Sequence, residues 1–118
     1  MEKMILVLIC LAIAGTGFAH PPRDVDIKVD GNKVEVTVDH PVGNTKLHLI
    51  DKIDLYVNGK KMVKQTFLVQ GENGQKVIYI IPSLKAEDVI KVKASCNKYG
   101  DKSKRLEVKG KQAKDKKK

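Results

Sequence analysis

Three histidines and one cysteine are the residues of this chain whose types and spacing could hold a metal ion. His40 and His48 stand at the two ends of a polar loop rich in turn-forming residues. A strand pattern precedes this loop and another follows it, so both imidazoles are expected where neighbouring strands emerge at one rim of a β domain. His20 and Cys96 supply two further donors. Imidazole and thiolate ligands together suit zinc, copper and iron, whereas carboxylate-rich sites suit calcium or magnesium.

The residues alone leave the identity of the metal open. Three histidines and one cysteine complete the ligand set of a tetrahedral zinc site or of a copper site. Iron needs open positions or a fifth ligand, and Tyr99, three residues after Cys96, could supply a phenolate to a ferric ion. If His20 became the first residue of a processed chain, its free amine and ring nitrogen could together chelate one copper ion. Without a metal, Cys96 would be a small buried hydrophobe and the histidines ordinary loop residues.

Residues 1–19 have the pattern of a secretory signal peptide. A short charged start leads into an apolar run at residues 4–13, and residues 17–19, Gly-Phe-Ala, form a small-x-small cleavage site. The apolar run is too short to span a bilayer comfortably. The pattern predicts an exported protein, either periplasmic or extracellular. Cys10 would leave with the signal, and Cys96 would then be the single cysteine of the mature chain, which is unusual in an oxidising compartment.

The chain is basic, with a formal net charge of +9, and much of that charge lies in its last ten residues. Residues 109–118 hold six lysines against the single Asp115 and show no apolar period, which predicts a disordered tail. Attraction of this tail to an anionic surface would be nonspecific. No platform of stacking aromatic residues accompanies the charge, so specific nucleic-acid binding is not expected.

Short alternating apolar runs and frequent turn signals predict an all-β domain. We expect seven strands, at residues 25–29, 34–38, 53–57, 61–69, 77–81, 89–94 and 105–108. The run at 77–81 is apolar almost throughout, which predicts a central strand stopped by Pro82. Asn58-Gly59 is the strongest turn signal in the chain, and residues 71–74, Gly-Glu-Asn-Gly, predict a further turn. Seven short strands without a long helix favour an antiparallel, immunoglobulin-like β-sandwich.

Several short motifs follow one another in a distinctive order. They are His20-x-Pro22, a Gly31-containing hairpin, His40-Pro41, His48 before a strand that starts at Ile50, and Cys96-Asn97-x-x-Gly100. This order resembles the iron-binding domain of the desulfoferrodoxin and superoxide reductase family, with residues 20–108 as the domain. The resemblance implies an immunoglobulin-like sandwich that holds one non-haem iron through four histidines and a cysteine. It also implies reduction of superoxide to hydrogen peroxide, with an electron donor as partner.

The resemblance places four residues of this chain at ligand positions of the family. His20 falls at the first ligand, His40 at the histidine of a His-Pro pair, His48 at the next histidine, and Cys96 at the axial thiolate. Iron bound by these four residues is therefore what the resemblance implies.

Two departures from the family bear on its activity. Tyr99 stands where the family has its last ligand histidine, and residues 18–19 stand where it has a Glu-Lys pair. Because that lysine assists superoxide chemistry in the family, the departures imply reduced or lost reductase activity. The alternative is a non-enzymatic exported β-sandwich that binds copper or zinc, or that acts as a cell-envelope interaction module.

Overall fold

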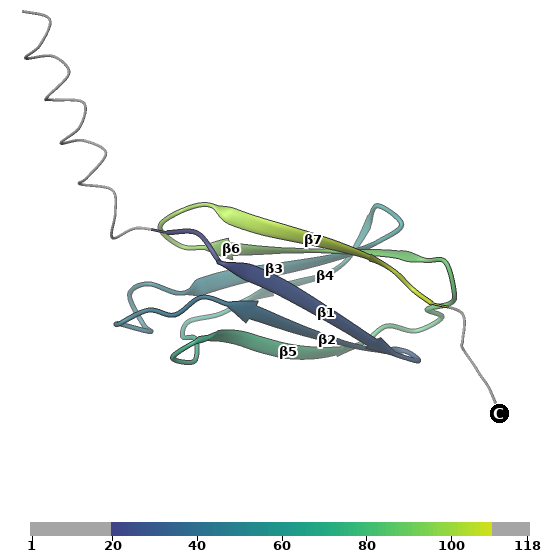
Figure 1. The fold of residues 1–118 in the computed structure, drawn as a ribbon, viewed down its shortest axis with the longest axis horizontal. Helices are drawn as coiled ribbons and strands as arrows, with labels where there is room; N and C mark the ends of the chain where they lie inside the picture. The colour runs from purple at the N-terminus through teal and green to yellow at the C-terminus, as the bar shows by residue number, and fades with distance from the viewer. Residues whose placement is uncertain (1–19, 110–118) are drawn as a thin grey trace, which may run out of the picture.

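The computed structural model describes residues 20–109, and within this range the chain forms seven β-strands and no helix (Figure 1). The strands are β1 (Asp24–Asp30), β2 (Lys33–Asp39), β3 (Ile50–Val57), β4 (Lys60–Thr66), β5 (Gly74–Ile80), β6 (Val89–Cys96) and β7 (Asp101–Glu107). The predicted signal peptide, residues 1–19, and residues 110–118 of the predicted tail lie outside the described residues. In the part of the chain that is described, no helix is long and apolar enough to cross a membrane.

The strands form two antiparallel sheets, which lie over one another as two layers (Figure 1). One sheet has the order β1-β2-β5 and the other has the order β4-β3-β6-β7. The turn between β3 and β4 is Asn58-Gly59, where both residues have positive φ, as the sequence predicted. The structure confirms the predicted immunoglobulin-like sandwich of seven strands.

The core lies between the two sheets and is built from alternate residues of the strands, because successive side chains of a strand point to opposite faces. Its aliphatic residues are fully or almost fully buried, and each contributes roughly 1.5–3 kcal/mol relative to an exposed position. The most deeply buried are Val25, Val34, Val36, Ile50, Ile53, Leu55, Ile90, Val92 and Ala94. These residues hold the strand ends, and thus the loops beyond them, in fixed positions.

The prediction that residues 77–81 form a central strand is wrong. The corresponding strand β5 lies at the edge of the three-stranded sheet and pairs only with β2. Val77 and Tyr79 are partly buried against the core, whereas Ile78 and Ile80 are 54% and 66% exposed. A continuous apolar run shows that both faces are apolar, but it does not determine whether a second strand pairs along the open edge.

Three other strands begin or end at least three residues away from the predicted bounds. β3 starts at Ile50, three residues before the predicted start, and β4 ends at Thr66, three residues before the predicted end. β7 starts at Asp101, four residues earlier than predicted, because it pairs with the whole length of β6. Its first five residues are charged or polar and exposed, so they show no apolar alternation in the sequence.

Candidate metal centre

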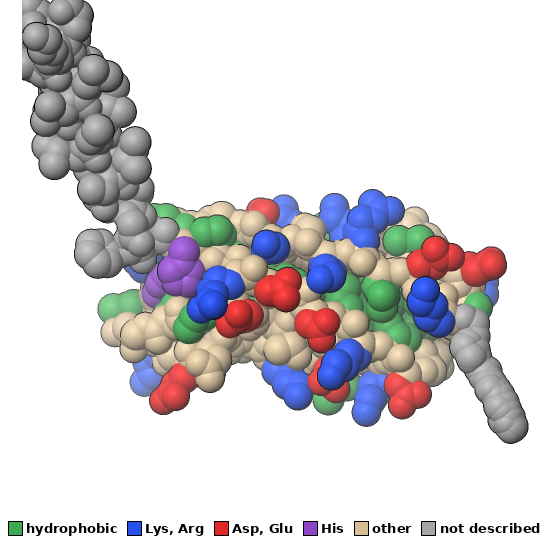
Figure 2. Space-filling model, in the orientation of Figure 1, with side chains coloured by type: hydrophobic (Ala, Val, Ile, Leu, Met, Phe, Trp, Pro, Cys, Tyr) green, Lys and Arg blue, Asp and Glu red, His purple; other side chains and the backbone are tan. Residues whose placement is uncertain are grey.

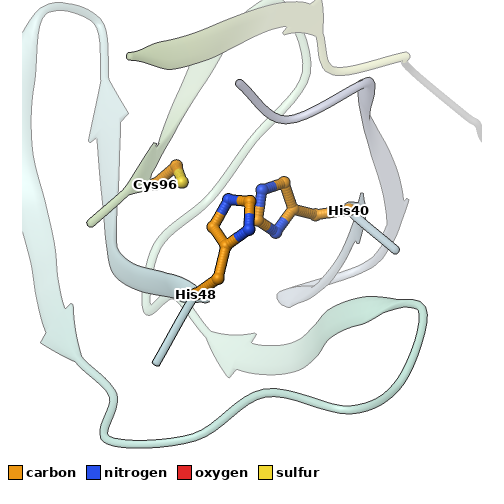
Figure 3. A group of neighbouring side chains, drawn as sticks. All are labelled: His40, His48 and Cys96. Carbon is orange, nitrogen blue, oxygen red and sulfur yellow. The ribbon is translucent and has the colours of Figure 1, made fainter. Parts of the chain in front are cut away.

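One rim of the sandwich brings together the ends of three strands and the residues before β1. His40 directly follows β2, His48 lies two residues before β3, and Cys96 is the last residue of β6. The nitrogen and sulfur atoms that these three residues offer as ligands all lie within 4.8 Å of one another. Figure 3 shows the two imidazole rings side by side, with the Cys96 sulfur directed toward them.

His20, four residues before β1, lies beside the two imidazoles of this group of three. Its ring centroid lies 5.0 Å from that of His40 and 5.4 Å from that of His48, and the last two centroids are 4.8 Å apart. The Nδ1 atom of His20 donates a hydrogen bond to the carbonyl oxygen of Pro21 at 3.0 Å, which leaves Nε2 as the free ring nitrogen. Histidine is visible at this end of the molecule in Figure 2. The structure therefore groups His40, His48 and Cys96 and places the His20 ring beside the two histidines, and the role of all four residues as ligands stays a prediction.

Two of the ring nitrogens lack any hydrogen-bond partner although they are buried. They are Nε2 of His40 and Nε2 of His48. A buried polar atom without a partner costs free energy, and native proteins rarely leave one unless an ion, a water molecule or a ligand satisfies it. Three imidazoles and a thiolate form a donor set that suits iron, zinc or copper. The residues present thus fit a metal ion.

A close approach between β2 and β5 positions His40. Gly74 starts β5 with a φ of 142°, a conformation that favours glycine. A Cβ atom at Gly74 would overlap the carbonyl oxygen of Val38 and would lie 2.9 Å from the backbone nitrogen of His40. That nitrogen donates a hydrogen bond to the carbonyl oxygen of Asn73 at 2.7 Å. The predicted Gly71–Gly74 turn therefore fixes the backbone at His40.

Two asparagines position His48. The side-chain oxygen of Asn44 accepts hydrogen bonds from the backbone nitrogens of Lys46 and Leu47, both at 3.1 Å. The backbone carbonyl oxygen of Asn44 accepts a hydrogen bond from the backbone nitrogen of His48 at 3.0 Å. Asn97 holds both neighbours of His48, because its side chain accepts from the nitrogen of Leu49 at 3.1 Å and donates to the carbonyl of Leu47 at 3.0 Å. Asn97 directly follows Cys96, so one residue ties the thiol to the loop.

The thiol of Cys96 is buried beside the turn that follows β6. Cys96 is 8% exposed, and no disulfide involves it. The backbone nitrogen of Lys98 donates a hydrogen bond to its sulfur at 3.4 Å. The sulfur also lies 4.0 Å from the side-chain oxygen of Asn97.

Burial is the main reason why the pKa of His48 lies below its ordinary value of 6.5. The charges of His40, His20 and Lys98 lower it further, and a hydrogen bond with the backbone of His20 opposes them. A lowered pKa keeps the imidazole neutral at neutral pH, with a lone pair available to a metal ion.

Tyr99 stands beside the site rather than among the four donors. Its ring lies edge-on to that of His48 with the centroids 6.0 Å apart, and it is 45% exposed. It belongs to the turn between β6 and β7, which Gly100 closes with a φ of 72° and a hydrogen bond from the nitrogen of Cys96. Its role as a further ligand stays a prediction.

Sequence reasoning missed Gln70, which contacts His40 directly. Its side-chain oxygen accepts hydrogen bonds from Nδ1 of His40 at 2.9 Å and from the backbone nitrogen of Ile50 at 2.8 Å. Its side-chain nitrogen donates to the carbonyl oxygens of His40 at 2.6 Å and Gly71 at 3.0 Å. Gln70 lies 30 residues after His40, in the loop between β4 and β5 directly after three apolar residues, and no pattern in the sequence indicates that it is buried.

No family model matches the sequence, and no curated protein matches it. Three solved structures show what the chain is similar to. The superoxide reductase (1Fe-SOR) from Giardia intestinalis is 20% identical, with a TM-score of 0.60, over 75% of this chain and 100% of that chain. The superoxide reductase (neelaredoxin) from Ignicoccus hospitalis is 25% identical, with a TM-score of 0.56, over 76% of this chain and 80% of that chain.

The superoxide reductase from Nanoarchaeum equitans is 22% identical, with a TM-score of 0.52, over 75% of this chain and 92% of that chain. The chain therefore has the fold of the superoxide reductases, which confirms the resemblance predicted from its motifs. The site at the rim consists of residues that the resemblance singled out.

Proposed function

We propose that this protein binds a single non-haem iron and reduces superoxide to hydrogen peroxide. The observation that carries the proposal is the convergence of three imidazoles and one thiol at the rim of a superoxide reductase fold. Two buried imidazole nitrogens in this group have no hydrogen-bond partner. His20, His40, His48 and Cys96 would hold the ion. A ferrous ion in this position supplies one electron, and superoxide, this electron and two protons together give hydrogen peroxide.

The chain's own residues would orient the ion and attract the substrate. The hydrogen bonds of His20 and His40 occupy their Nδ1 atoms and leave the Nε2 atoms for the ion. The charge of Lys98, close enough to act on the pKa of His48, would attract anionic superoxide to this rim. Both protons would come from solvent, because His20 is only partly buried and the rim is open there.

The yield of hydrogen peroxide tests this proposal. The processed protein is purified without oxygen, reduced, and mixed with superoxide in a single turnover. A reductase forms one hydrogen peroxide for each superoxide consumed, whereas dismutation forms one for every two. We expect the first ratio, and we expect His40→Ala to abolish it. A yield no different from spontaneous dismutation, or zinc or copper as the only metal retained, would contradict the proposal.

We further propose that the protein is exported and that cleavage after Ala19 makes His20 the first residue of the mature chain. The signal pattern of residues 1–19 supports this proposal. The electron donor would then be a partner of the same compartment, periplasmic or extracellular, and any contact of the lysine-rich tail with an anionic surface would be nonspecific. The mass of the protein recovered from the cell envelope or the medium tests it, since a mass that includes residues 1–19 would contradict it.

A further inference from the structure

We propose that Gln70 is a positioning residue that holds the His40 ring with its proton on Nδ1 and its lone pair on Nε2, ready for a metal ion. This inference deepens the proposed function and rests on it only where it concerns metal binding. The orientation of the Gln70 amide decides the tautomer, because the two ends of a glutamine amide have the same shape and opposite hydrogen-bonding character.

The backbone alone fixes the orientation of the Gln70 amide. The nitrogen of Ile50 can only donate, so the side-chain atom 2.8 Å from it must be the oxygen. The carbonyl oxygens of His40 and Gly71 can only accept, so the atom 2.6 and 3.0 Å from them must be the nitrogen. Three backbone groups agree, and none of them depends on the imidazole.

The fixed amide then determines the tautomer of His40. Nδ1 of His40 faces the Gln70 oxygen at 2.9 Å and must carry a proton to bond with it. A neutral imidazole has one N–H, so Nε2 has none and keeps its lone pair. Nε2 is the buried atom without a partner, in a residue that is 0% exposed. The Gln70 contact thus explains why this nitrogen, rather than Nδ1, is the free one.

Gln70 also fixes where the ring lies. The residue is 5% exposed and joins the end of β2, at His40, to the start of β3, at Ile50. Partners of this kind orient a ligand, and their loss typically weakens metal binding by about 10- to 100-fold. Gln75 offers a matched control, because it is a partly buried glutamine whose side chain donates to the carbonyls of Ile50 and Val69 and not to His40.

The first test uses the metal-free protein and measures the nitrogen chemical shifts of His40 by NMR, at a pH about two units above the ordinary imidazole value. We expect Nδ1 of His40 to be protonated and Nε2 to be unprotonated. In Gln70→Leu the two tautomers should mix, while Gln75→Leu should retain the single form. A proton on Nε2 of His40 in the unmodified protein would overturn the inference, even if Gln70→Leu failed to fold.

The second test measures ferrous iron affinity by competition with a chelator. We expect Gln70→Leu to bind about 10- to 100-fold more weakly and Gln75→Leu to bind as the unmodified protein does. Equal losses of affinity in Gln70→Leu and Gln75→Leu would show a merely structural role.

The two tests separate this inference from the proposed function. If the single His40 tautomer is present but the protein binds no iron, the proposed function fails and the positioning by Gln70 stands. If the protein binds iron with the His40 proton on Nε2 in the metal-free form, the proposed function stands and the inference fails.

Discussion

Lys98 is the cationic residue at the site that the structure adds to the predicted donors. Its charge contributes to the lowered pKa of His48, and its backbone nitrogen donates to the sulfur of Cys96. The resemblance predicts no role for it, and the lysine that assists superoxide chemistry in the family has no counterpart at residues 18–19. Under the proposed function, Lys98 would therefore help to attract the anionic substrate.

Reversing this charge should slow the reaction with superoxide. We expect Lys98→Glu to lower the second-order rate constant on the order of tenfold at low ionic strength, and we expect added salt to reduce the difference. Stopped-flow measurement of superoxide decay over a range of ionic strength checks this. Lys60→Glu makes the same change of net charge at the exposed first residue of β4, away from the rim, and should have little effect. Equal slowing by both variants would refute a local role.

Individual residues also show how far the sequence determines the site. Each of the four predicted donors could be selected because imidazole and thiolate side chains are few, and the turn signals around His40 and His48 place them at strand ends. Gln70 could not be selected, because its role comes from burial and from backbone groups 20 and 30 residues away. Patterns among residues that are close in sequence contain no information about burial or about contacts with distant backbone groups.

Strand β5 connects the core with the site, since its first residue, Gly74, lies against the backbone that carries His40. The sequence predicts the turn at Gly71–Gly74 but not this close approach, which depends on the pairing of β5 with β2. The sequence also predicts a strand here but not its place at the sheet edge. Pairing partners that are distant in sequence determine both features.

Gly74→Ala should disturb the site more than the addition of a single methyl group suggests. The added Cβ would meet the carbonyl of Val38, a backbone atom that cannot move without breaking the β2–β5 register, and alanine rarely adopts the φ of this position. We expect a loss of stability of about 1–3 kcal/mol and weaker iron binding. Urea unfolding and chelator competition measure the two effects. Gly43→Ala, in the loop before His48 where an added Cβ meets nothing within 4 Å, is the control.

The contact between β5 and β4 predicts a loss of stability at alkaline pH. Burial and the charge of Asp54 raise the pKa of Tyr79 from 10.0 to about 12, while its hydroxyl donates to Gln65 at 2.6 Å. The unfolded chain releases this proton near pH 10. The contribution of Tyr79 to the free energy of unfolding is therefore complete below pH 10 and is lost as the pH rises toward 12. Denaturant unfolding at a series of pH values checks this.

The variant Tyr79→Phe provides the control for the alkaline transition. This variant should lack the decline in the free energy of unfolding that the ionisation of Tyr79 causes between pH 10 and 12. In the folded protein, ultraviolet titration should show one of the three tyrosines ionising about two pH units later than an unperturbed phenol. Ionisation of all three tyrosines together near pH 10 in the folded state would contradict the assignment.

At the scale of the whole molecule, the sandwich is the feature that the sequence predicts best. Alternating valines and isoleucines on β1, β2 and β6, with turn signals between them, specify the inward faces without any knowledge of partners. Which strands pair across the molecule, such as β2 with β5 and β3 with β6, depends on contacts far apart in sequence. The site forms only after this pairing, because its donors come from strand ends that distant pairs bring together.

Because the donors come from four separate segments, a bound metal should stabilise the fold as a whole. A ligand that binds only the folded state at about 100 times its dissociation constant adds about 2.7 kcal/mol, which for a domain of this size corresponds to about 10–20 °C in Tm. We expect ferrous iron to raise Tm by this order without oxygen, and a chelator to reverse it. Calorimetry of the metal-free and iron-loaded protein measures it, and an unchanged Tm at saturation would contradict the four-segment site.

The iron content and the visible spectrum of the processed protein, purified without oxygen and compared with Cys96→Ser, test the central claim most directly. The account predicts about one iron per chain, and in the oxidised form a thiolate-to-iron charge-transfer band that disappears in the variant. Comparison of the circular dichroism of the two proteins controls for folding. An absence of iron and of the band in the unmodified protein, with both proteins equally folded, would contradict the account.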